Sequence, residues 1–136
     1  MSETMFLLFN QVVRNQSDLI DLARTGIPKN AVVKMAKQLS FSGKELAIII
    51  NLSERTLQRY PDNKKLEKTA SEKAIQLAKL YERGREVWGD LEHFKGWMRH
   101  PNSFLGSKTP LEILDTNFGF EMVLDEIGRI EHGILA

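Results

Sequence analysis

The chain has 136 residues, enough for one compact domain or two small ones with a buried core. Apolar residues make up 42% and charged residues 27%, the proportions of an ordinary globular protein rather than of a long disordered chain. Because the chain has no cysteine, disulfides and thiolate zinc sites are excluded, and a cytoplasmic location is expected.

The charge is unevenly distributed, although the net value is only +1. Between residues 34 and 65, seven basic residues stand against three acidic ones, a local balance of +4. From residue 112 to the end, six acidic residues stand against Arg129 alone, a balance of −5. The two halves are therefore expected to bind different partners.

Residues 1–16 contain the apolar run MFLLF at positions 5–9, which lacks a basic leader and a cleavage site. Neither a signal peptide nor a membrane span is predicted there. The run is interpreted either as a dimer contact or as part of a disordered extension.

Apolar residues recur at helical spacing along almost the whole chain, which predicts an all-α fold. The run AIII at residues 47–50 is an exception, and it is interpreted as a short buried helix because GKEL precedes it. Helices are expected at residues 17–26, 30–39, 43–51, 53–60, 71–89, 90–100, from 109, and from about 120 to 133. The expected N-caps are Ser17 or Asp18, Asn30, Ser71, and Thr109 in a capping box with Glu112 and Pro110. Gly26 and Gly133 are expected to end their helices.

The two short helices in the basic half predict a helix-turn-helix. Ala47 is small at the expected crossing, Asn51 tolerates a left-handed turn, and Leu52 and Leu57 would fill the space between the helices. Ser53 would cap the second helix. The predicted DNA-binding residues are Ser53, Arg55, Thr56, Gln58 and Arg59, whose side chains suit base edges and phosphates. The competing interpretation is a solvated amphipathic helix, which the charge asymmetry disfavours.

No pattern in the chain predicts catalysis. His93 and His100 are seven residues apart, and no zinc-protease motif, carboxylate-rich metal loop or phosphate-binding glycine loop is present. No metal, cofactor or catalytic residue is therefore expected. The aromatic residues Trp88, Phe94, Trp97 and Phe104 are expected to build the core between the two parts of the chain.

Two motifs mark the C-terminal end: PNSFLGSKTPLEIL at residues 101–114 and GRIEHGILA at residues 128–136. In these motifs the chain closely resembles the C-terminal domain of the Xre/MbcA/ParS-type antitoxins, which partner RES-domain toxins. Upstream, LSFSGKELAIIINLSERTLQRY is similar to the Xre-like helix-turn-helix of that family. The resemblance runs from about residue 17 to residue 136. Asn51 departs from the glycine that is commoner in this turn.

The resemblance implies a cytoplasmic type II antitoxin that inhibits a RES-domain toxin, an NAD-consuming enzyme similar in fold to ADP-ribosyltransferases. It also implies a homodimer that represses its own operon by binding operator DNA, with no membrane partner. The expected organisation is an extension at residues 1–16, the helix-turn-helix region at 17–68, linking helices at 69–100, and the toxin-binding region at 101–136.

In this family the C-terminal segment lies at the mouth of the NAD pocket of the toxin. The implied toxin-binding residues are Arg129, Glu131, His132, Gly133, Ile134, Leu135 and Ala136. A sharp exit at Gly133 would let the last residues leave the surface and enter an apolar slot. The competing interpretation makes this segment an ordinary helix end, with Ile130 in the core and His132 near the helix dipole. Asn102 is expected to brace its loop.

Two other functions stay open at this point. The chain would be a stand-alone transcription regulator if its C-terminal part only dimerised, and no toxin gene would then lie beside it. Alternatively, it would neutralise a toxin without binding DNA, which the departure at Asn51 allows.

Overall fold

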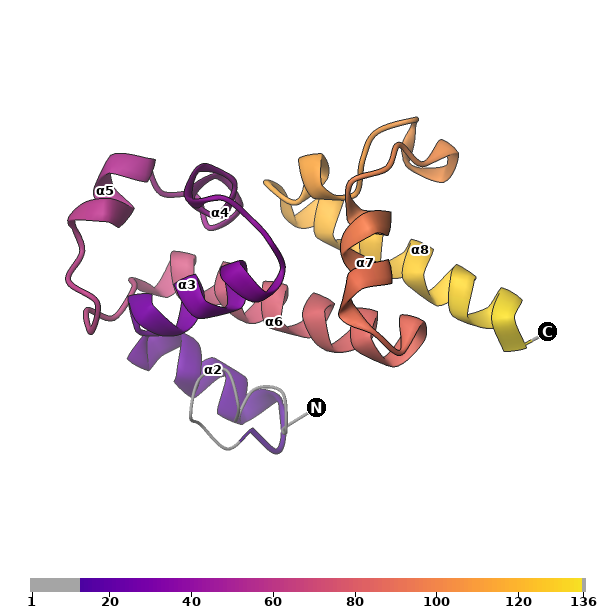
Figure 1. Cartoon of the computed structure of the whole chain (residues 1–136). Coiled ribbons are helices and arrows are strands. Elements are labelled where there is room, and N and C mark those ends of the chain that lie inside the picture. Colours follow the sequence, from indigo (N-terminus) through magenta and orange to yellow (C-terminus); the bar gives the residue numbers. More distant parts are fainter. Residues whose placement is uncertain (1–12, 136) are drawn as a thin grey trace. The chain divides into compact units, whose positions relative to one another are not determined.

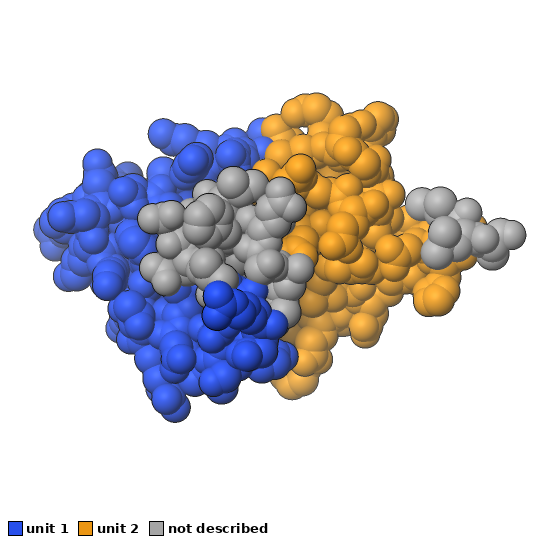
Figure 2. All heavy atoms as spheres, turned by 90° about the horizontal axis from the view of Figure 1, so that it is seen from below, with its two compact units in different colours: residues 1–79 blue, residues 80–136 orange. Residues whose placement is uncertain are grey.

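The computed structural model describes residues 13–135, and its regular elements are all helical in that range. The all-α prediction is thus confirmed. The chain forms two compact units, residues 1–79 and residues 80–136 (Figures 1 and 2). The run MFLLF lies outside the described residues. No helix in the described range combines the length and the apolar content needed to cross a bilayer.

In its described part, residues 13–79, the first unit contains four complete helices and the start of another (Figure 1). These are α2 (Gln16–Thr25), α3 (Lys29–Gln38), α4 (Gly43–Ile49), α5 (Glu54–Arg59) and the beginning of α6 (Lys68–Trp88). Each helix turns apolar residues inward, so Leu22, Met35, Leu46 and Leu77 are all buried in one core. The α4 helix packs against α3 and α5. The run AIII forms the end of α4, as predicted, with Ile50 as the C-cap, although Ile48 is 53% exposed.

After α5 the chain returns along the turn between α2 and α3. Leu66 N donates to Ile27 O at 2.8 Å, and Lys29 N donates to Lys64 O at 2.9 Å. Gly26 ends α2, as predicted, with φ +97°. A Cβ on Gly26 would lie 2.6 Å from the carbonyl oxygen of Leu66, so this close backbone approach requires glycine.

Three of the predicted N-caps in the first unit are wrong. Asn15 caps α2 in place of Ser17 or Asp18, and its Oδ1 accepts a 3.0 Å hydrogen bond from Asp18 N. The α3 helix starts at Lys29, directly after Pro28, with no side-chain cap. Ser71 is fully buried inside α6, where its Oγ accepts from Ile27 N and donates to Leu66 O. Ser71 thus serves the core through a tertiary hydrogen bond, which its sequence neighbours do not reveal.

The second unit contains the end of α6, α7 (Leu91–Met98), two 3₁₀ turns, η1 (Ser103–Leu105) and η2 (Leu111–Ile113), and the long helix α8 (Asn117–Leu135). Asp90 caps α7 by accepting a 2.8 Å hydrogen bond from His93 N. Phe94, Leu114, Phe120, Val123 and Ile127 are essentially inaccessible to solvent. These apolar positions, most of them on α7 and α8, form the core of the unit.

Of the aromatic residues expected in the core, Phe94 is buried in the second unit and Phe104 is exposed. Phe94 is fully buried and its ring centroid lies 5.3 Å from that of Trp88, while Trp97 lies 4.9 Å from Trp88. Both tryptophans are only half-buried. Phe104 is 63% exposed, because the η1 turn directs Leu105 inward instead.

The predicted helices near the C-terminus also differ from the observed ones. Thr109 and Glu112 do form the capping box, with bonds of 2.8 and 3.2 Å, but only the 3₁₀ turn η2 follows it. The last helix starts at Asn117 rather than Phe120. It also continues through Gly133 to Leu135, so Gly133 does not end it. Glycine costs helix stability without always terminating the helix.

Candidate functional site

The helix-turn-helix geometry is built by α4, the turn after it, and α5. Ser42 opens α4 with a full capping box, in which Ser42 Oγ accepts from Glu45 N and Glu45 Oε1 accepts from Ser42 N. Asn51 has φ +61°, the left-handed conformation predicted for the turn. Leu52 N then donates to Ala47 O at 2.9 Å, which closes the turn against the buried Ala47.

The α5 helix is anchored by one apolar residue and capped by Ser53. Ser53 Oγ accepts from Thr56 N at 3.0 Å and donates to Thr56 Oγ1 at 2.7 Å. Leu57 is 5% exposed and fixes the helix to the core, while Leu52 is only half-buried. All five predicted DNA-binding residues are exposed on α5 or at its start: Ser53, Arg55, Thr56, Gln58 and Arg59.

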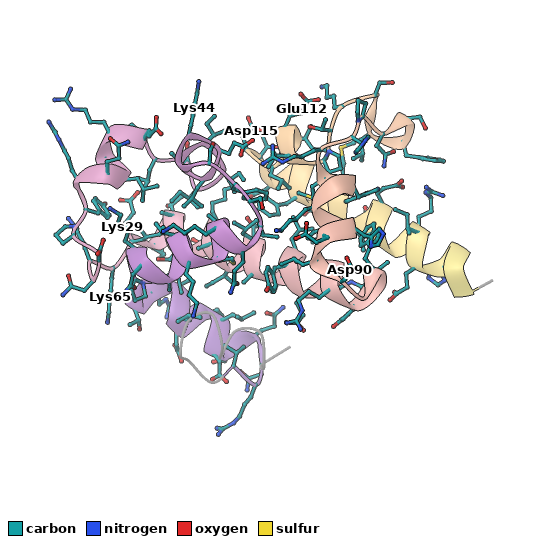
Figure 3. The ribbon with its side chains drawn as sticks, in the orientation of Figure 1. Lys29, Lys44, Lys65, Asp90, Glu112 and Asp115 are labelled. Carbon is teal, nitrogen blue, oxygen red and sulfur yellow. The ribbon has the colours of Figure 1, made fainter. Side chains whose placement is uncertain are left out.

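The first unit also exposes many basic side chains. The basic residues counted between residues 34 and 65 are all exposed: Lys34, Lys37, Lys44, Arg55, Arg59, Lys64 and Lys65. In Figure 3, Lys44 extends from α4 away from the body of the first unit. Exposed lysine and arginine side chains attract phosphate groups, so their excess in this part of the chain is compatible with a nucleic-acid partner.

Sequence reasoning missed the role of Lys29. Its Nζ donates to the carbonyl oxygen of Tyr60 at 2.8 Å and reaches the carbonyl oxygen of Gln58 at 3.5 Å. Lys29 thereby binds the free carbonyl groups at the end of α5. A second lysine contacts the same segment, since Lys64 Nζ lies 4.3 Å from the centroid of the Tyr60 ring. The signal in the sequence was weak, because Lys29 and Tyr60 are 31 positions apart.

The candidate residues of the C-terminal part lie on α8. Arg129, His132 and Gly133 are exposed, and positions three or four apart share one face of a helix. Further toward the start of α8, Phe118 is 79% exposed and Met122 is 46% exposed. The helix that carries three exposed residues of the predicted toxin-binding set therefore also carries two exposed apolar side chains.

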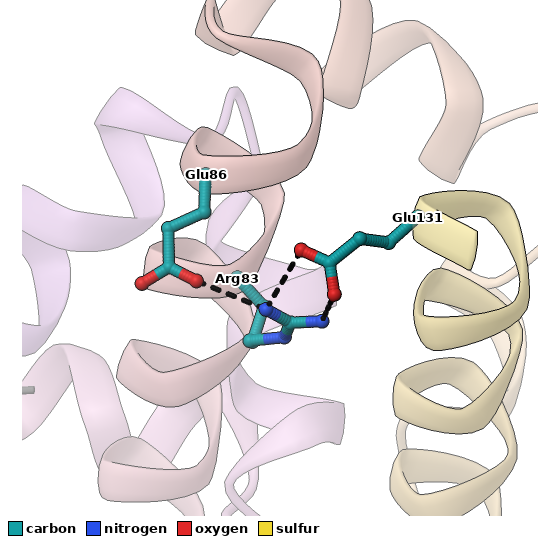
Figure 4. A network of polar contacts seen from close by, with 3 residues as sticks. All are labelled: Arg83, Glu86 and Glu131. Carbon is teal, nitrogen blue, oxygen red and sulfur yellow. Dashed lines mark hydrogen bonds and ion pairs between the residues drawn. The ribbon is translucent and has the colours of Figure 1, made fainter. Parts of the chain in front are cut away.

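Glu131 points to a different side of α8. Its carboxylate accepts hydrogen bonds of 2.9 and 3.4 Å from Arg83 on α6, within the same unit (Figure 4). Arg83 also donates to Glu86 at 3.0 Å. The hydrogen bond from Arg83 holds the pKa of Glu131 below its usual value. The hydrogen bond to Glu131 in turn raises the pKa of Arg83. The structure thus separates Glu131 from the face of Arg129 and His132.

The remaining predicted toxin-binding residues are placed only in part. The backbone of Ile134 and Leu135 belongs to the last turn of α8. Ala136 lies outside the described residues. Since the helix continues past Gly133, the last described residues follow the helix axis and make no sharp exit.

Arg129 is held by a buried carboxylate. Its Nε and Nη2 donate to the two oxygens of Glu126 at 2.7 and 2.9 Å, and the Glu126 side chain is only 5% exposed. Asn102 Nδ2 donates to Glu126 at 3.1 Å, and Asn102 Oδ1 accepts from Phe104 N at 2.8 Å. The hydrogen bond from Arg129 lowers the pKa of Glu126, despite the opposing effect of burial. Asn102 thus braces its loop, as predicted.

His93 and His100 each contact a residue only three or four positions earlier in the sequence. His93 Nδ1 lies 2.7 Å from the Asp90 carboxylate, and His100 Nδ1 lies 2.7 Å from the Gly96 carbonyl oxygen. No group of three or more histidine or acidic side chains in residues 13–135 is arranged to hold a metal ion.

Comparisons with known proteins match both units. Residues 18–79 match the model of the Antitoxin Xre-like helix-turn-helix domain, and residues 83–133 match the model of the Antitoxin Xre/MbcA/ParS C-terminal toxin-binding domain. A curated relative, Antitoxin Xre of Photorhabdus laumondii, is 29% identical over 113 residues, which cover 82% of this chain and 76% of the relative. The chain therefore belongs to the Xre/MbcA/ParS antitoxin family, with an Xre-like helix-turn-helix domain followed by a toxin-binding domain.

Proposed function

We propose that this antitoxin neutralises a RES-domain, NAD-consuming toxin by covering the entrance of its active site with the C-terminal part of α8. The observation that carries the proposal is the exposed face of α8, on which Arg129, His132 and Gly133 follow one another toward the C-terminus. A continuous helix that presents charged and small residues can be inserted into a cleft as a rigid rod. The predicted toxin-binding residues are Arg129, His132, Gly133, Ile134, Leu135 and Ala136, with Glu131 supporting the helix through Arg83.

The second part of the proposal is repression of the antitoxin's own operon. The exposed residues of α5 would enter the major groove of operator DNA, with Arg55, Thr56 and Arg59 as the main contacts and Ser53 and Gln58 beside them. A homodimer would present two such helices to half-sites about one helical turn apart. Because the operator and the NAD of the toxin are cytoplasmic, the antitoxin would act in the cytoplasm. It would need no cofactor and would catalyse no reaction of its own.

The experiment is co-expression with the protein encoded next to this chain, followed by pull-down and an NAD-consumption assay. One antitoxin is full-length and the other ends at His132, which preserves the pairs of Arg129 with Glu126 and of Glu131 with Arg83. The full chain is expected to bind and to silence NAD consumption, whereas the shortened chain should inhibit much less.

Two results would contradict the proposal. If the shortened chain inhibits as well as the full chain, the C-terminus does not cover the active site. If the full chain does not bind the protein encoded beside it, a stand-alone transcription regulator becomes the better description of this chain. Equal melting temperatures of the two chains serve as the folding control, and equal operator binding shows that the helix-turn-helix of the other unit is unaffected.

A further inference from the structure

Phe104 is a large aromatic side chain that the fold leaves at the surface. It sits in η1, 63% exposed, while the neighbouring Leu105 fills the core. The guanidinium of Arg129 lies 3.7 Å from the centroid of the Phe104 ring. An arginine at this distance stacks on the aromatic face and gains a cation–π attraction. Phe104 is thus exposed, but one of its faces is covered by a cation.

Arg129 is held in this position along its edge as well. Glu126 binds the Nε–Nη2 edge of the guanidinium through both carboxylate oxygens, and Asn102 binds the same carboxylate. Asn102 Oδ1 in turn accepts a hydrogen bond from the backbone N–H of Phe104. These contacts form a closed ring of four residues, Asn102, Glu126, Arg129 and Phe104, which we name the Phe104–Arg129 cluster. The loop motif and α8 are therefore tied together at this point.

The cluster leaves part of the arginine available. The Arg129 side chain is 52% exposed. Apart from the Nε and Nη2 bonds to Glu126, the N–H groups of Arg129 have no acceptor among the residues that the structure describes. The Nη1 side of a guanidinium carries donors in a planar arrangement that matches the two oxygens of a carboxylate. Beside this donor edge lies the uncovered remainder of the Phe104 ring.

We propose that the Phe104–Arg129 cluster is a preformed anchor for the toxin, in which Arg129 binds an acidic side chain of the toxin and Phe104 packs against an adjacent apolar group. This inference rests on the proposed function and adds Phe104 as a contact residue, with Glu126 and Asn102 as positioning residues. Arginine and large aromatic residues are enriched among the side chains that dominate binding at protein interfaces.

The physical reason for the arrangement is preorganisation. A free arginine side chain must lose rotamer freedom when it binds, which reduces affinity. Here stacking on Phe104 and pairing with the buried Glu126 have already ordered Arg129 in the free antitoxin. Glu126 is satisfied by three hydrogen bonds, so it has little remaining capacity to compete with a carboxylate of the partner.

The test measures the dissociation constant of the full-length antitoxin for the protein encoded beside it. Arg129→Lys keeps the charge but loses the flat face and the paired donors, and Phe104→Leu keeps apolar volume but loses the aromatic face. Arg85→Lys is the matched control, because Arg85 is also exposed and lies over an aromatic ring, that of Tyr81 at 5.8 Å. Melting temperature and operator affinity are recorded for every variant.

We expect Arg129→Lys to weaken binding about 10- to 100-fold and Phe104→Leu about 5- to 20-fold, with Arg85→Lys within about two-fold of the unchanged chain. The variant that carries both Arg129→Lys and Phe104→Leu should lose less affinity than the product of the two single losses, since the two side chains act together. Raising the salt concentration should weaken the unchanged chain more than Arg129→Ala, because the proposed contact is ionic.

The anchor is overturned if the unchanged antitoxin binds its neighbour while both single variants bind within about two-fold of it. That result would leave the proposed function standing, since the C-terminal segment would still inhibit the enzyme. An unchanged antitoxin that does not bind its neighbour contradicts both proposals together. A loss of binding accompanied by an equal loss of operator affinity would assign these residues to folding and would also overturn the anchor.

Discussion

Arg83 and Glu131, which are 48 residues apart in the sequence, are joined by hydrogen bonds of 2.9 and 3.4 Å that fix the last turns of α8 to α6 (Figure 4). Arg83→Ala removes both bonds. We expect the backbone amides around residue 131 to exchange with solvent about two- to five-fold faster, the range typical of a surface ion pair. Hydrogen exchange followed by mass spectrometry measures this rate.

Glu86→Gln is the matched control for Arg83→Ala. It removes the pair between Arg83 and Glu86 but leaves the pair with Glu131 in place. Equal exchange rates in the two variants would mean that Arg83 does not hold the helix end.

Glu126 predicts a pH dependence of stability. Hydrogen bonding to Arg129 and Asn102 lowers the pKa of Glu126 below its ordinary value of 4.5 in the folded state. Its contribution to stability is therefore complete above pH 4.5 and is lost as the pH falls through the lower folded-state pKa. Glu126→Gln should destabilise the second unit by about 1–3 kcal/mol at pH 7.

The same variant should differ less from the unchanged chain at a second pH chosen below 4.5, because the carboxylate of Glu126 protonates as the pH falls through its lowered folded-state pKa. Urea unfolding at both pH values measures the free energy difference. A difference that is the same at both pH values would show that the ionised carboxylate is not what stabilises the folded state.

Two glycines of the second unit should respond oppositely to alanine. A Cβ on Gly84 would overlap the buried ring of Phe94, whereas a Cβ on Gly128 would meet no atom within 4 Å. Gly84→Ala should therefore destabilise the protein by about 1–3 kcal/mol through overpacking. Gly128→Ala should stabilise it by up to about 1 kcal/mol, because alanine favours the helix. Similar unfolding midpoints for the two variants in urea would contradict this prediction.

The left-handed conformation of Asn51 predicts how the helix-turn-helix tolerates substitution. With φ +61°, Asn51→Gly should leave stability unchanged or raise it slightly, and Asn51→Ala should lower it by about 1 kcal/mol. Thermal unfolding of the two variants compares these effects. If alanine were as stable as glycine at this position, the turn would have a different backbone conformation in solution.

Operator binding should depend on Arg55 and Arg59 together. Both are exposed on α5, and replacing them by alanine should weaken binding by about 1–3 kcal/mol for each arginine and should reduce its salt dependence. Arg24→Ala is the control, because Arg24 is exposed in the same unit but lies on α2. Operator fragments titrated at two salt concentrations supply the measurement. Unchanged affinity in the double variant would favour an antitoxin that does not bind DNA.

Local patterns in the sequence were sufficient to predict an all-α fold and the turn between α4 and α5, but not every helix or its ends. Helical periodicity reports which side of each segment is apolar, and Asn51 and Gly26 report backbone conformations that few residues adopt. These signals act over one or two turns. For the same reason the exposed positions of α5 could be predicted, since they follow once Leu57 is assigned to the core.

Contacts between distant segments were decided only by the tertiary structure. Ser71 is a plausible N-cap by its neighbours, yet it is buried against Ile27, and Phe104 is a core-type residue that lies exposed beside Arg129. Glu131 and Arg129 are both charged residues near the end of one helix in the sequence, and only folding gives them different partners on α6 and α8. The physical reason is that periodicity assigns a residue to a face of its own helix, whereas its partners depend on which other segments pack there.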